Sequence, residues 1–540
     1  MTKRVLHNAA AWSGDGVDHH AIAIEGGVIV ALDDAAVRWG RDHDAEFLDL
    51  AGGFVMPAFA DGHAHPLFGG LESDGPSVRG HDSIAGIVAA VRQYAAEHPD
   101  LEWIVGASYE SSLSPAGLFD ARWLDEAVSD RPVLLRAWDY HTVWVNTRAL
   151  ELAGIRAETP DPALGEIPRR DDGSALGTLR EWGAIDLVTA VMPRRSLEAR
   201  IAAIERAGRH YASLGITWVQ DAWVEPEQLE AYLAAAQADR LPIRFNLALY
   251  ADPRHWPGTL EVLIEGREQV RRLGHPLLTA NTVKFFADGV VENATAALLE
   301  PYMSEPGNTG MLVWSAEGLA EAVAAVDAAG FQPHIHTIGD GAVRLGLDAV
   351  EHAERQNGTR DRRAVLAHVQ LVDEADLDRF ARLDVTANAE PLWAQLDPLM
   401  NVLTVPRLGE KRSAAQYQLS TLTSRGARLS FGSDWPVSSA DPLEGLAVAC
   451  SRQTQERQPS GGWTPHERLR IEAALLAYTA GVAHQAFRTA GLLQVGHDAD
   501  LVVLSGDPRT VTDPRDLDTL HVTSTWLDGE CIFAATEGTP

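Results

Sequence analysis

Residues 54–66 read FVMPAFADGHAHP, an apolar run that ends in the pair His63 and His65. Side chains two residues apart on a strand point to the same face, so this run predicts a strand whose last inward side chains are two imidazoles. Two neutral imidazoles at one strand end form half of a metal site. The chain has 20 His residues, so this spacing alone is a weak signal and its interpretation depends on the rest of the chain.

Strand-like runs alternate with helical stretches through the middle of the chain, which predicts parallel βαβ units. Seven runs follow one another from Ile216 onward and residues 55–63 make an eighth, the number that closes a (β/α)8 barrel. The eight runs are residues 55–63, 216–221, 243–250, 282–288, 331–338, 363–370, 384–390 and 428–434. The predicted fold class is therefore α/β, with a (β/α)8 TIM barrel over residues 55–490.

The two ends of the chain carry β-strand signals of their own. Hairpin turns are expected near Gly26-Gly27 and at Asp528-Gly529. Neither end has enough apolar residues for its own core, so residues 1–54 and 491–540 are predicted to pair into one composite β-sandwich domain. Disorder is expected only in the closing residues 537–540.

An insertion is predicted after the first barrel strand, over about residues 67–192. Two surplus strand-like runs, residues 103–109 and 132–138, fall inside it, together with loop-like segments rich in Pro, Gly and charge. We interpret it as a lid or a substrate-pocket subdomain.

Composition excludes several classes of function. The formal net charge of −31 would repel phosphate backbones and anionic lipid headgroups, so neither nucleic acid nor a membrane is an expected partner. Cys450 and Cys531 are the only two cysteines and offer no disulfide framework and no cysteine metal motif. The N-terminus lacks a continuous apolar stretch, so a cytoplasmic location is expected.

In a barrel of this kind, catalytic groups lie at the C-terminal ends of the strands. Metal-ligand residue types stand there on five of the eight predicted strands: His63 and His65, Lys284, His334 and His336, His368, and Asp434. Each has a structural alternative. His334 is a candidate for a buried, hydrogen-bonded histidine, Asp434 could cap a turn, and a buried Lys284 must be paired or modified.

These segments, in this order, resemble the amidohydrolase superfamily, and specifically its third amidohydrolase family, which includes N-substituted formamide deformylases. The similarity runs from GGFVMPAFADGHAHP through VKFFADG, HTIGD and FGSDWPV to GLLQVGHDADLVVLSGDP. It implies a (β/α)8 barrel with a composite β-sandwich and a divalent metal centre. Two Zn2+ ions per chain are expected, and a single ion stays an open alternative.

The resemblance also implies ligand roles. His63 and His65 would bind one ion, His336 and His368 a second, and a carboxylated Lys284 would bridge the two. Asp434 would ligate the first ion and act as general base and then acid, while a metal-activated hydroxide attacks the substrate.

Further residues are candidates for substrate binding. His141 and Asn146, in the segment DYHTVWVN, could bind substrate or lie in the packing of the insertion. Two positions depart from the family pattern: Ala367 stands where Glu is usual, and Glu390 stands where Gln is frequent. Glu390 could bind a cationic group of the substrate or a metal.

The predicted function is hydrolysis of a non-peptide C–N bond in a small molecule. A one-metal deaminase and a non-catalytic small-molecule-binding barrel are the alternatives. The expected partner is a small-molecule substrate, and a homodimer is a further option.

Overall fold

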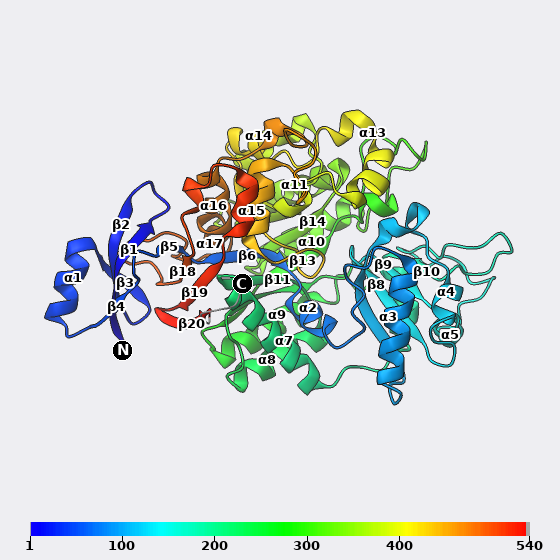
Figure 1. The fold of residues 1–540 in the computed structure, drawn as a ribbon. Coiled ribbons are helices and arrows are strands. Elements are labelled where there is room, and N and C mark those ends of the chain that lie inside the picture. Colours follow the sequence, from blue (N-terminus) through cyan, green and yellow to red (C-terminus); the bar gives the residue numbers. More distant parts are fainter. Residues whose placement is uncertain (1, 536–540) are drawn as a thin grey trace.

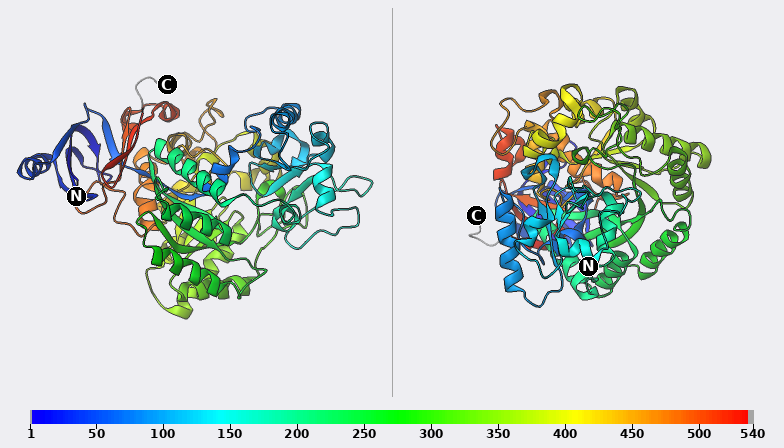
Figure 2. Two further views of the ribbon diagram at one scale, coloured as in Figure 1. Left: turned by 90° about the horizontal axis from the view of Figure 1, so that it is seen from below. Right: turned by 90° about the vertical axis from the view of Figure 1, so that its right-hand side faces the viewer.

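The computed structural model describes residues 2–535. The disorder expected for residues 537–540 lies outside the described residues. The molecule is elongated. A barrel forms its middle, a sheet built from both chain ends lies at one end, and a smaller sheet lies at the other (Figures 1 and 2).

The barrel confirms the predicted fold class. Eight parallel strands are hydrogen-bonded in the order β6 to β17, and β17 also contacts β6, which nearly closes the ring. The strands are β6 (Phe59–Ala64), β11 (Ile216–Val224), β12 (Arg244–Tyr250), β13 (Leu278–Phe286), β14 (Gln332–Thr337), β15 (Val365–His368), β16 (Thr386–Ala389) and β17 (Arg428–Phe431).

The first predicted strand, residues 55–63, proves to be two strands in two sheets. β5 (Phe54–Pro57) pairs with strands of the chain ends, whereas β6 pairs with β11 in the barrel. The change of partner falls between adjacent residues: Ala58 N donates to Asp500 O and Phe59 N donates to Gly215 O. The apolar run continues across this point because both strands are buried, so hydrophobicity could not reveal the break.

Helices cover the outside of the barrel. Several begin at a side-chain cap, such as Ser196, which accepts from Ala199 N, and Ser315, which accepts from Gly318 N. The helices after residue 190 are α7 (Leu197–Ser213), α8 (Pro226–Gln237), α9 (Leu260–Leu273), α10 (Ala316–Ala328), α11 (Asp340–Asn357), α12 (Leu377–Arg382), α13 (Val405–Ser413), α14 (Leu419–Ser424), α15 (Pro442–Ser451), α16 (Ile471–Tyr478) and α17 (Ala480–Gln485).

Strands from both chain ends share one continuous eight-stranded sheet. The N-terminal part supplies β1 (Lys3–Trp12), β2 (Asp18–Glu25), β3 (Val28–Leu32), β4 (Glu46–Asp49) and β5, and the C-terminal part supplies β18 (Leu501–Leu504), β19 (Val522–Leu527) and β20 (Glu530–Ala534). The expected hairpins are present between β2 and β3 and between β19 and β20. The predicted β-sandwich is thus a single hydrogen-bonded sheet that surrounds a common core, which includes Leu6, Ile29 and Trp526. Helix α1 (Asp33–Asp42) packs on the outer face of β1 and β2.

A separate four-stranded sheet is formed by the part of the chain that comes between α2 (Pro66–Glu72) and α7 in the sequence. Its strands are β7 (Ile104–Tyr109), β8 (Val133–Ala137), β9 (Thr142–Val145) and β10 (Thr178–Arg180), flanked by α3 (Ile84–Glu97), α4 (Ala121–Asp125), α5 (Thr147–Leu152) and α6 (Glu181–Thr189). The sequence revealed β7 and β8 but not the two shortest strands. Among the described residues, no helix is both long and apolar enough to cross a membrane.

Candidate metal centre

The predicted ligands meet at the C-terminal end of the barrel, on the side of the inserted sheet. His63 and His65 come from the end of β6, Lys284 from β13, His336 from β14, His368 from the end of β15, and Asp434 from the loop after β17. All six side chains are buried. They converge because parallel strands end at one rim of a barrel and their inward side chains point to its axis.

The tightest group is formed by His63, His65 and Asp434, whose ligating atoms lie within 4.8 Å of one another. Asp434 Oδ1 is 3.0 Å from His65 Nε2 and 3.6 Å from His63 Nε2. Backbone hydrogen bonds fix the two loops together: Asp434 N donates to His63 O and His65 N donates to Trp435 O. The two strand ends therefore hold the three ligand atoms in register.

The three residues fit a divalent metal. Asp434 Oδ1 is buried and has no hydrogen-bond partner among the described residues, although both histidine Nε2 atoms converge on it. Two imidazole nitrogens and a carboxylate oxygen are the donor types that Zn2+ prefers. An uncompensated buried carboxylate oxygen is costly, and a cation would compensate it.

A second group lies beside the first. The ring centroids of His336 and His368 are 4.5 Å apart, and those of His63 and His368 are 4.6 Å apart. Lys284 Nζ is 3.5 Å from His63 Nε2 and 4.4 Å from the centroid of the Phe286 ring. The structure thus brings the predicted second pair and the predicted bridge next to the first group.

Asp288, which follows Lys284 in the segment VKFFADG, does not pair with it. Its carboxylate accepts hydrogen bonds from the backbone N–H groups of Ala297, Ile338 and Gly339. Within residues 2–535, Lys284 has no carboxylate at ion-pair distance. Burial lowers the pKa of Lys284 to about 7, so its amine has an unusually large neutral fraction.

The pKa values of His63, His368 and Asp434 are shifted in the directions that suit metal ligands. Burial, together with the nearby charge of Lys284, holds the pKa of His63 well below its usual value. Burial lowers the pKa of His368 to about 3. Burial by itself would raise the pKa of Asp434, but the His65 imidazole, whose Nε2 is 3.0 Å from Asp434 Oδ1, lowers it below the ordinary value. Neutral imidazoles and an ionised carboxylate are the forms that bind metals.

Two further buried residues support the first strand end. His334 Nε2 is 2.8 Å from His63 Nδ1, so His334 stands behind His63 as a hydrogen-bond partner. Asp61 accepts from Ser433 N at 3.0 Å and from His63 N at 3.2 Å, which joins the ends of β6 and β17. His334 is thus the buried, hydrogen-bonded histidine that the sequence allowed, whereas Asp61 could not be recognised from the sequence.

The structure separates the three predicted substrate-binding residues. His141 lines the pocket above the metal ligands, and its Nδ1 is 2.8 Å from Glu181 Oε2. Asn146 lies away from the pocket, where it caps α5 by accepting from Ala149 N and donates to Val128 O and Arg131 O. Its hydrogen-bonding groups are used in the insertion, so the proposed contact with substrate is wrong for Asn146.

Glu390 also differs from the expectation of a substrate-binding group. Its side chain is fully buried behind His368, with Oε2 2.8 Å from His368 Nδ1, and it does not line the pocket. The chain turns inward at the end of β16, a direction that the sequence could not show. Glu390 therefore contacts a predicted ligand instead of the substrate space.

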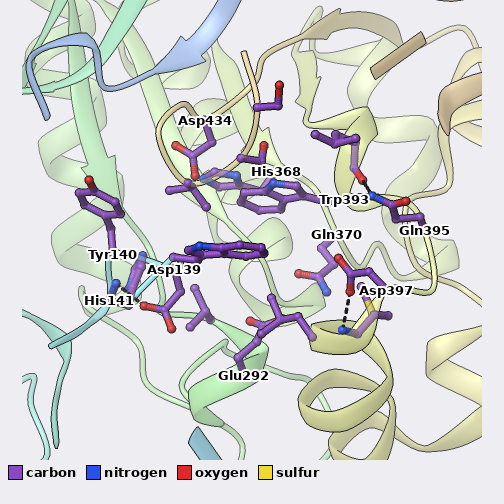
Figure 3. A pocket seen from close by; sticks show the side chains of 18 of the residues that line it. Asp139, Tyr140, His141, Glu292, His368, Gln370, Trp393, Gln395, Asp397 and Asp434 are labelled. Carbon is purple, nitrogen blue, oxygen red and sulfur yellow. Dashed lines mark hydrogen bonds between the residues drawn. The ribbon is translucent and has the colours of Figure 1, made fainter. Parts of the chain in front are cut away.

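The pocket has a volume of about 690 Å³ and opens above the ligands. Its walls combine aromatic rings with carboxylates. The aromatic residues include Trp138, Trp182, Trp223 and Trp393, and the carboxylates outside the metal group include Glu110, Asp139, Glu292 and Asp397. Figure 3 shows Asp434 and His368 on one side of this space and Glu292 on the opposite side. Sequence reasoning missed these wall residues, because they come from scattered loops, helices and strand ends of the insertion and of the barrel and share no motif.

Comparisons with known proteins identify the family of the chain. The model of the amidohydrolase family matches residues 46–533. YtcJ of Bacillus subtilis (strain 168), named as an amidohydrolase, is 30% identical over 96% of this chain and 97% of its own length. N-substituted formamide deformylase of Arthrobacter pascens is 26% identical over 96% of this chain and 95% of its own length.

A solved structure from Pyrococcus furiosus, described as an uncharacterized metal-dependent hydrolase, is 26% identical. It superposes with a TM-score of 0.73 and covers 94% of this chain and 100% of its own. The chain therefore belongs to the amidohydrolase family, and it is a hydrolase for which this family implies a divalent metal.

Proposed function

We propose that the protein hydrolyses a non-peptide C–N bond, such as that of an amide or a formamide, in a small molecule. The observation that carries this proposal is the convergence of His63, His65 and Asp434 within 4.8 Å below a pocket of about 690 Å³. The name of the Arthrobacter pascens relative, an N-substituted formamide deformylase, supports this choice of bond.

The strand-end residues have distinct roles in this proposal. When bound, a divalent cation lowers the pKa of a water molecule and polarises a carbonyl group. His63, His65 and Asp434 would hold one ion, and His336 and His368 a second. Zn2+ is the expected ion, because imidazole and carboxylate donors suit it.

Lys284 would bridge the two positions as a carbamate. Its amine is fully buried, is 3.5 Å from His63 Nε2 and has a pKa lowered to about 7 by burial. A neutral amine can add carbon dioxide and release a proton, and the resulting carbamate carries one negative charge that is shared by two oxygens. Electron density for three additional atoms on Nζ would support this assignment, and an unmodified amine directed away from bound metal would contradict it.

Asp434 transfers the proton of the attacking water in this proposal. Its lowered pKa keeps the carboxylate ionised at neutral pH, so it can accept the proton of the attacking water and return it to the leaving nitrogen. His141 lies on the pocket wall beside His336, with ring centroids 5.4 Å apart. We propose that it donates a hydrogen bond to the substrate, since Glu181 holds its other nitrogen.

The pocket walls favour neutral or cationic substrates. Glu110, Asp139, Glu292 and Asp397 place several carboxylates around the same space. Burial raises the pKa of both Asp139 and Asp397 to about 6, and Glu292 adds to the shift of each. An anionic group of a substrate would meet repulsion here, whereas an aromatic or ammonium group would be bound by the tryptophans and carboxylates.

A hydrolysis screen tests the proposal. Metal-loaded protein would be incubated with N-formyl amines, N-acyl amines, cyclic amides and carbamates, each as a matched set with a neutral, an ammonium and a carboxylate substituent. We expect release of the free amine from a formyl or acyl amide, with the carboxylate member hydrolysed least. Failure to cleave any of these bonds in protein with bound metal would contradict the proposal.

A one-metal deaminase is the second candidate, and one observation favours it. Only His63, His65 and Asp434 form a tight ligand group among the described residues, while His336 Nε2 lies 3.2 Å from Gly289 O. Metal analysis of protein purified without chelators distinguishes the two: we expect about two ions per chain, whereas one ion together with ammonia release from aminated rings would favour the deaminase.

A further inference from the structure

His368 is held on two sides by one short segment after β16. Glu390, the residue that follows β16, places Oε2 2.8 Å from His368 Nδ1. The chain then turns through residues 391–393, with Trp393 N donating to Glu390 O. This turn lays the Trp393 ring over the His368 ring at a centroid distance of 5.3 Å and an interplanar angle of 2°. Figure 3 shows the two rings in this arrangement.

Glu390 and Trp393 together fix which edge of the His368 ring faces the other predicted metal ligands. The two nitrogens of an imidazole ring lie on divergent edges, so a group bound at Nδ1 stands on the far side from Nε2. Glu390 is fully buried behind the ring, and His368 itself lines the pocket. Glu390 is therefore placed to orient His368, and it is not placed to bind the metal itself.

A carboxylate at Nδ1 also selects the tautomer. A neutral imidazole carries its proton on one nitrogen, and only the other nitrogen has a lone pair for a metal. A carboxylate is an acceptor, so it favours the proton on Nδ1 and leaves the lone pair on Nε2. Without this acceptor, the opposite tautomer would direct an N–H group toward the cation.

The backbone conformation at His368 restricts the positions that its ring can take. His368 has a φ of +74° and Val369 a φ of +39°, values that are uncommon for residues with a side chain. The end of β15 is thus bent sharply, and contacts from the neighbouring strand end define the ring position. Those contacts are supplied by Glu390 and Trp393.

We propose that Glu390 is the positioning residue that makes His368 a metal ligand, and that Trp393 holds the ring in the matching plane. The inference rests on the proposed function only in requiring that the centre binds a divalent metal. It does not depend on which bond is hydrolysed. It also gives the fully buried carboxylate at this position a role that no contact with substrate can explain.

Metal affinity is the direct test. Glu390→Met keeps the length of the side chain and removes the acceptor, and Glu390→Gln keeps an oxygen but removes the charge. Loss of such a partner typically weakens metal binding about 10- to 100-fold. We expect a loss of this size for Glu390→Met and a smaller loss for Glu390→Gln, confined to one metal equivalent, in competition titrations with a chromogenic chelator.

The matched control is Glu292→Gln. It removes one carboxylate from the wall of the same pocket, where Glu292 accepts a hydrogen bond from Thr404, and it should leave metal affinity unchanged. The absorption spectrum of Co2+-loaded protein gives a second readout, because it reports the ligand set. It should change in the Glu390 variants and not in Glu292→Gln. Thermal melts of the metal-free proteins separate lost affinity from lost folding.

Two outcomes would overturn the inference. One is wild-type affinity and an unchanged Co2+ spectrum in both Glu390 variants, and Glu390→Gln decides alone if Glu390→Met does not fold. The other is equal weakening by Glu292→Gln, which would show a general effect of pocket charge. A wild-type protein that binds metal but hydrolyses no amide would refute the proposed function while leaving the role of Glu390 intact.

Discussion

At the scale of single residues, the centre is a set of polar groups buried in an apolar barrel. The side chains of Lys284, His334 and Asp288 are fully inaccessible to solvent. Burial raises the pKa of Asp288 to about 8, although three backbone hydrogen bonds oppose the shift, and burial lowers the pKa of Lys284 to about 7 against the charges of nearby carboxylates. Groups of this kind are tolerated where partners or function compensate for the cost of desolvation. Their concentration at one rim marks that rim as the candidate active site.

Asp434 is the residue on which the proposed chemistry depends most. Replacing Asp434 by Asn keeps an oxygen that can still be a ligand but removes the ability to take up a proton. We expect kcat to fall by about 10²–10⁴-fold, with a folded protein by circular dichroism. Asp376→Asn is the control, because Asp376 is also buried but binds Arg344 and Arg379 outside the pocket. Turnover near the wild-type level in Asp434→Asn would refute the assignment.

The pH dependence of stability tests His141. Burial by itself would lower the pKa of His141, but the charge and hydrogen bond of Glu181 raise it above its ordinary value. A raised pKa means that the folded protein binds the proton more tightly than the unfolded chain. The resulting stabilisation is complete below the unfolded pKa of about 6.5 and is lost as pH rises through the folded pKa.

The measurement is a series of thermal melts of chelator-treated wild type and His141→Gln from about pH 6 to about pH 9. The difference in melting temperature should be largest at the acidic end and should shrink toward the alkaline end. His521→Gln, which replaces an exposed histidine, should follow the wild type throughout. A difference that stays constant across this range would show that His141 has no raised pKa.

Residue type and strand position explain what the sequence could and could not predict about the site. His63, His65, Lys284, His336, His368 and Asp434 were recognisable because polar side chains stood at the ends of apolar runs. Asn146 and Glu390 were misassigned because the direction of a loop side chain depends on tertiary packing. Glu181, which holds His141, comes from the start of a helix and gives no signal in the sequence.

At the scale of elements, the long regular βα units were predictable and the short or shared strands were not. The hydrophobic pattern gave the seven barrel strands from β11 to β17. It joined β5 and β6 because both are buried, and it missed β9 and β10, which have four and three residues. Such short segments form because a neighbouring strand provides an edge, β8 for β9 and β9 for β10, which is a tertiary effect.

The loop that carries Asp434 is tied to the insertion by Arg79. This side chain donates to Glu72, to Ser108 Oγ at 2.6 Å and to Pro436 O, two residues after Asp434. It also lies 5.8 Å from the centre of the Trp138 ring on the pocket wall. The insertion therefore contacts both the substrate space and the loop that positions the proton acceptor.

We expect Arg79→Met to lower kcat/KM by at least about 10-fold, because small displacements of a catalytic group are costly. Hydrogen exchange should increase in residues 433–439. Arg131→Met is the control, since Arg131 donates only to backbone carbonyls within the insertion, those of Ala95, His98, Pro99 and Leu101. It should lower the melting temperature without the change in kcat/KM. Equal kinetics in the two variants would refute a role for Arg79 in positioning the loop.

At the scale of the whole molecule, the two accessory sheets lie on opposite ends of the barrel (Figure 1). The inserted sheet is next to the pocket, and the sheet of the chain ends is next to the first residues of the barrel strands, as β5 leads directly into β6. In this fold, catalytic residues typically lie at the C-terminal end of the barrel, and residues at its N-terminal end contribute to stability. The fold class and the pairing of the chain ends could be inferred from the sequence, but the contacts between the parts could not.

A buried ion pair joins the barrel to the sheet of the chain ends. Arg244, the first residue of β12, places Nη1 2.7 Å from Asp500 Oδ2 just before β18, and both side chains are only 7% exposed. Arg244 also contacts Asp528 in the turn between β19 and β20. This contact connects residues that are 256 and 284 positions apart, so it reports on the assembly of the whole molecule.

Breaking one side of this pair should cost more than removing both charges. Arg244→Met leaves the buried Asp500 carboxylate with only Arg488, at the longer distance of 3.7 Å, as an ion-pair partner, and we expect it to reduce stability by up to about 3–5 kcal/mol. Asp500→Asn leaves the Arg244 guanidinium with only the half-exposed Asp528 as partner and should also be destabilising. In the double variant no unpaired buried charge remains at these two positions, so it should be more stable than Arg244→Met alone. Urea unfolding of the three variants, followed by tryptophan fluorescence, gives the comparison. Losses that simply add in the double variant would show that the two residues do not act as a pair.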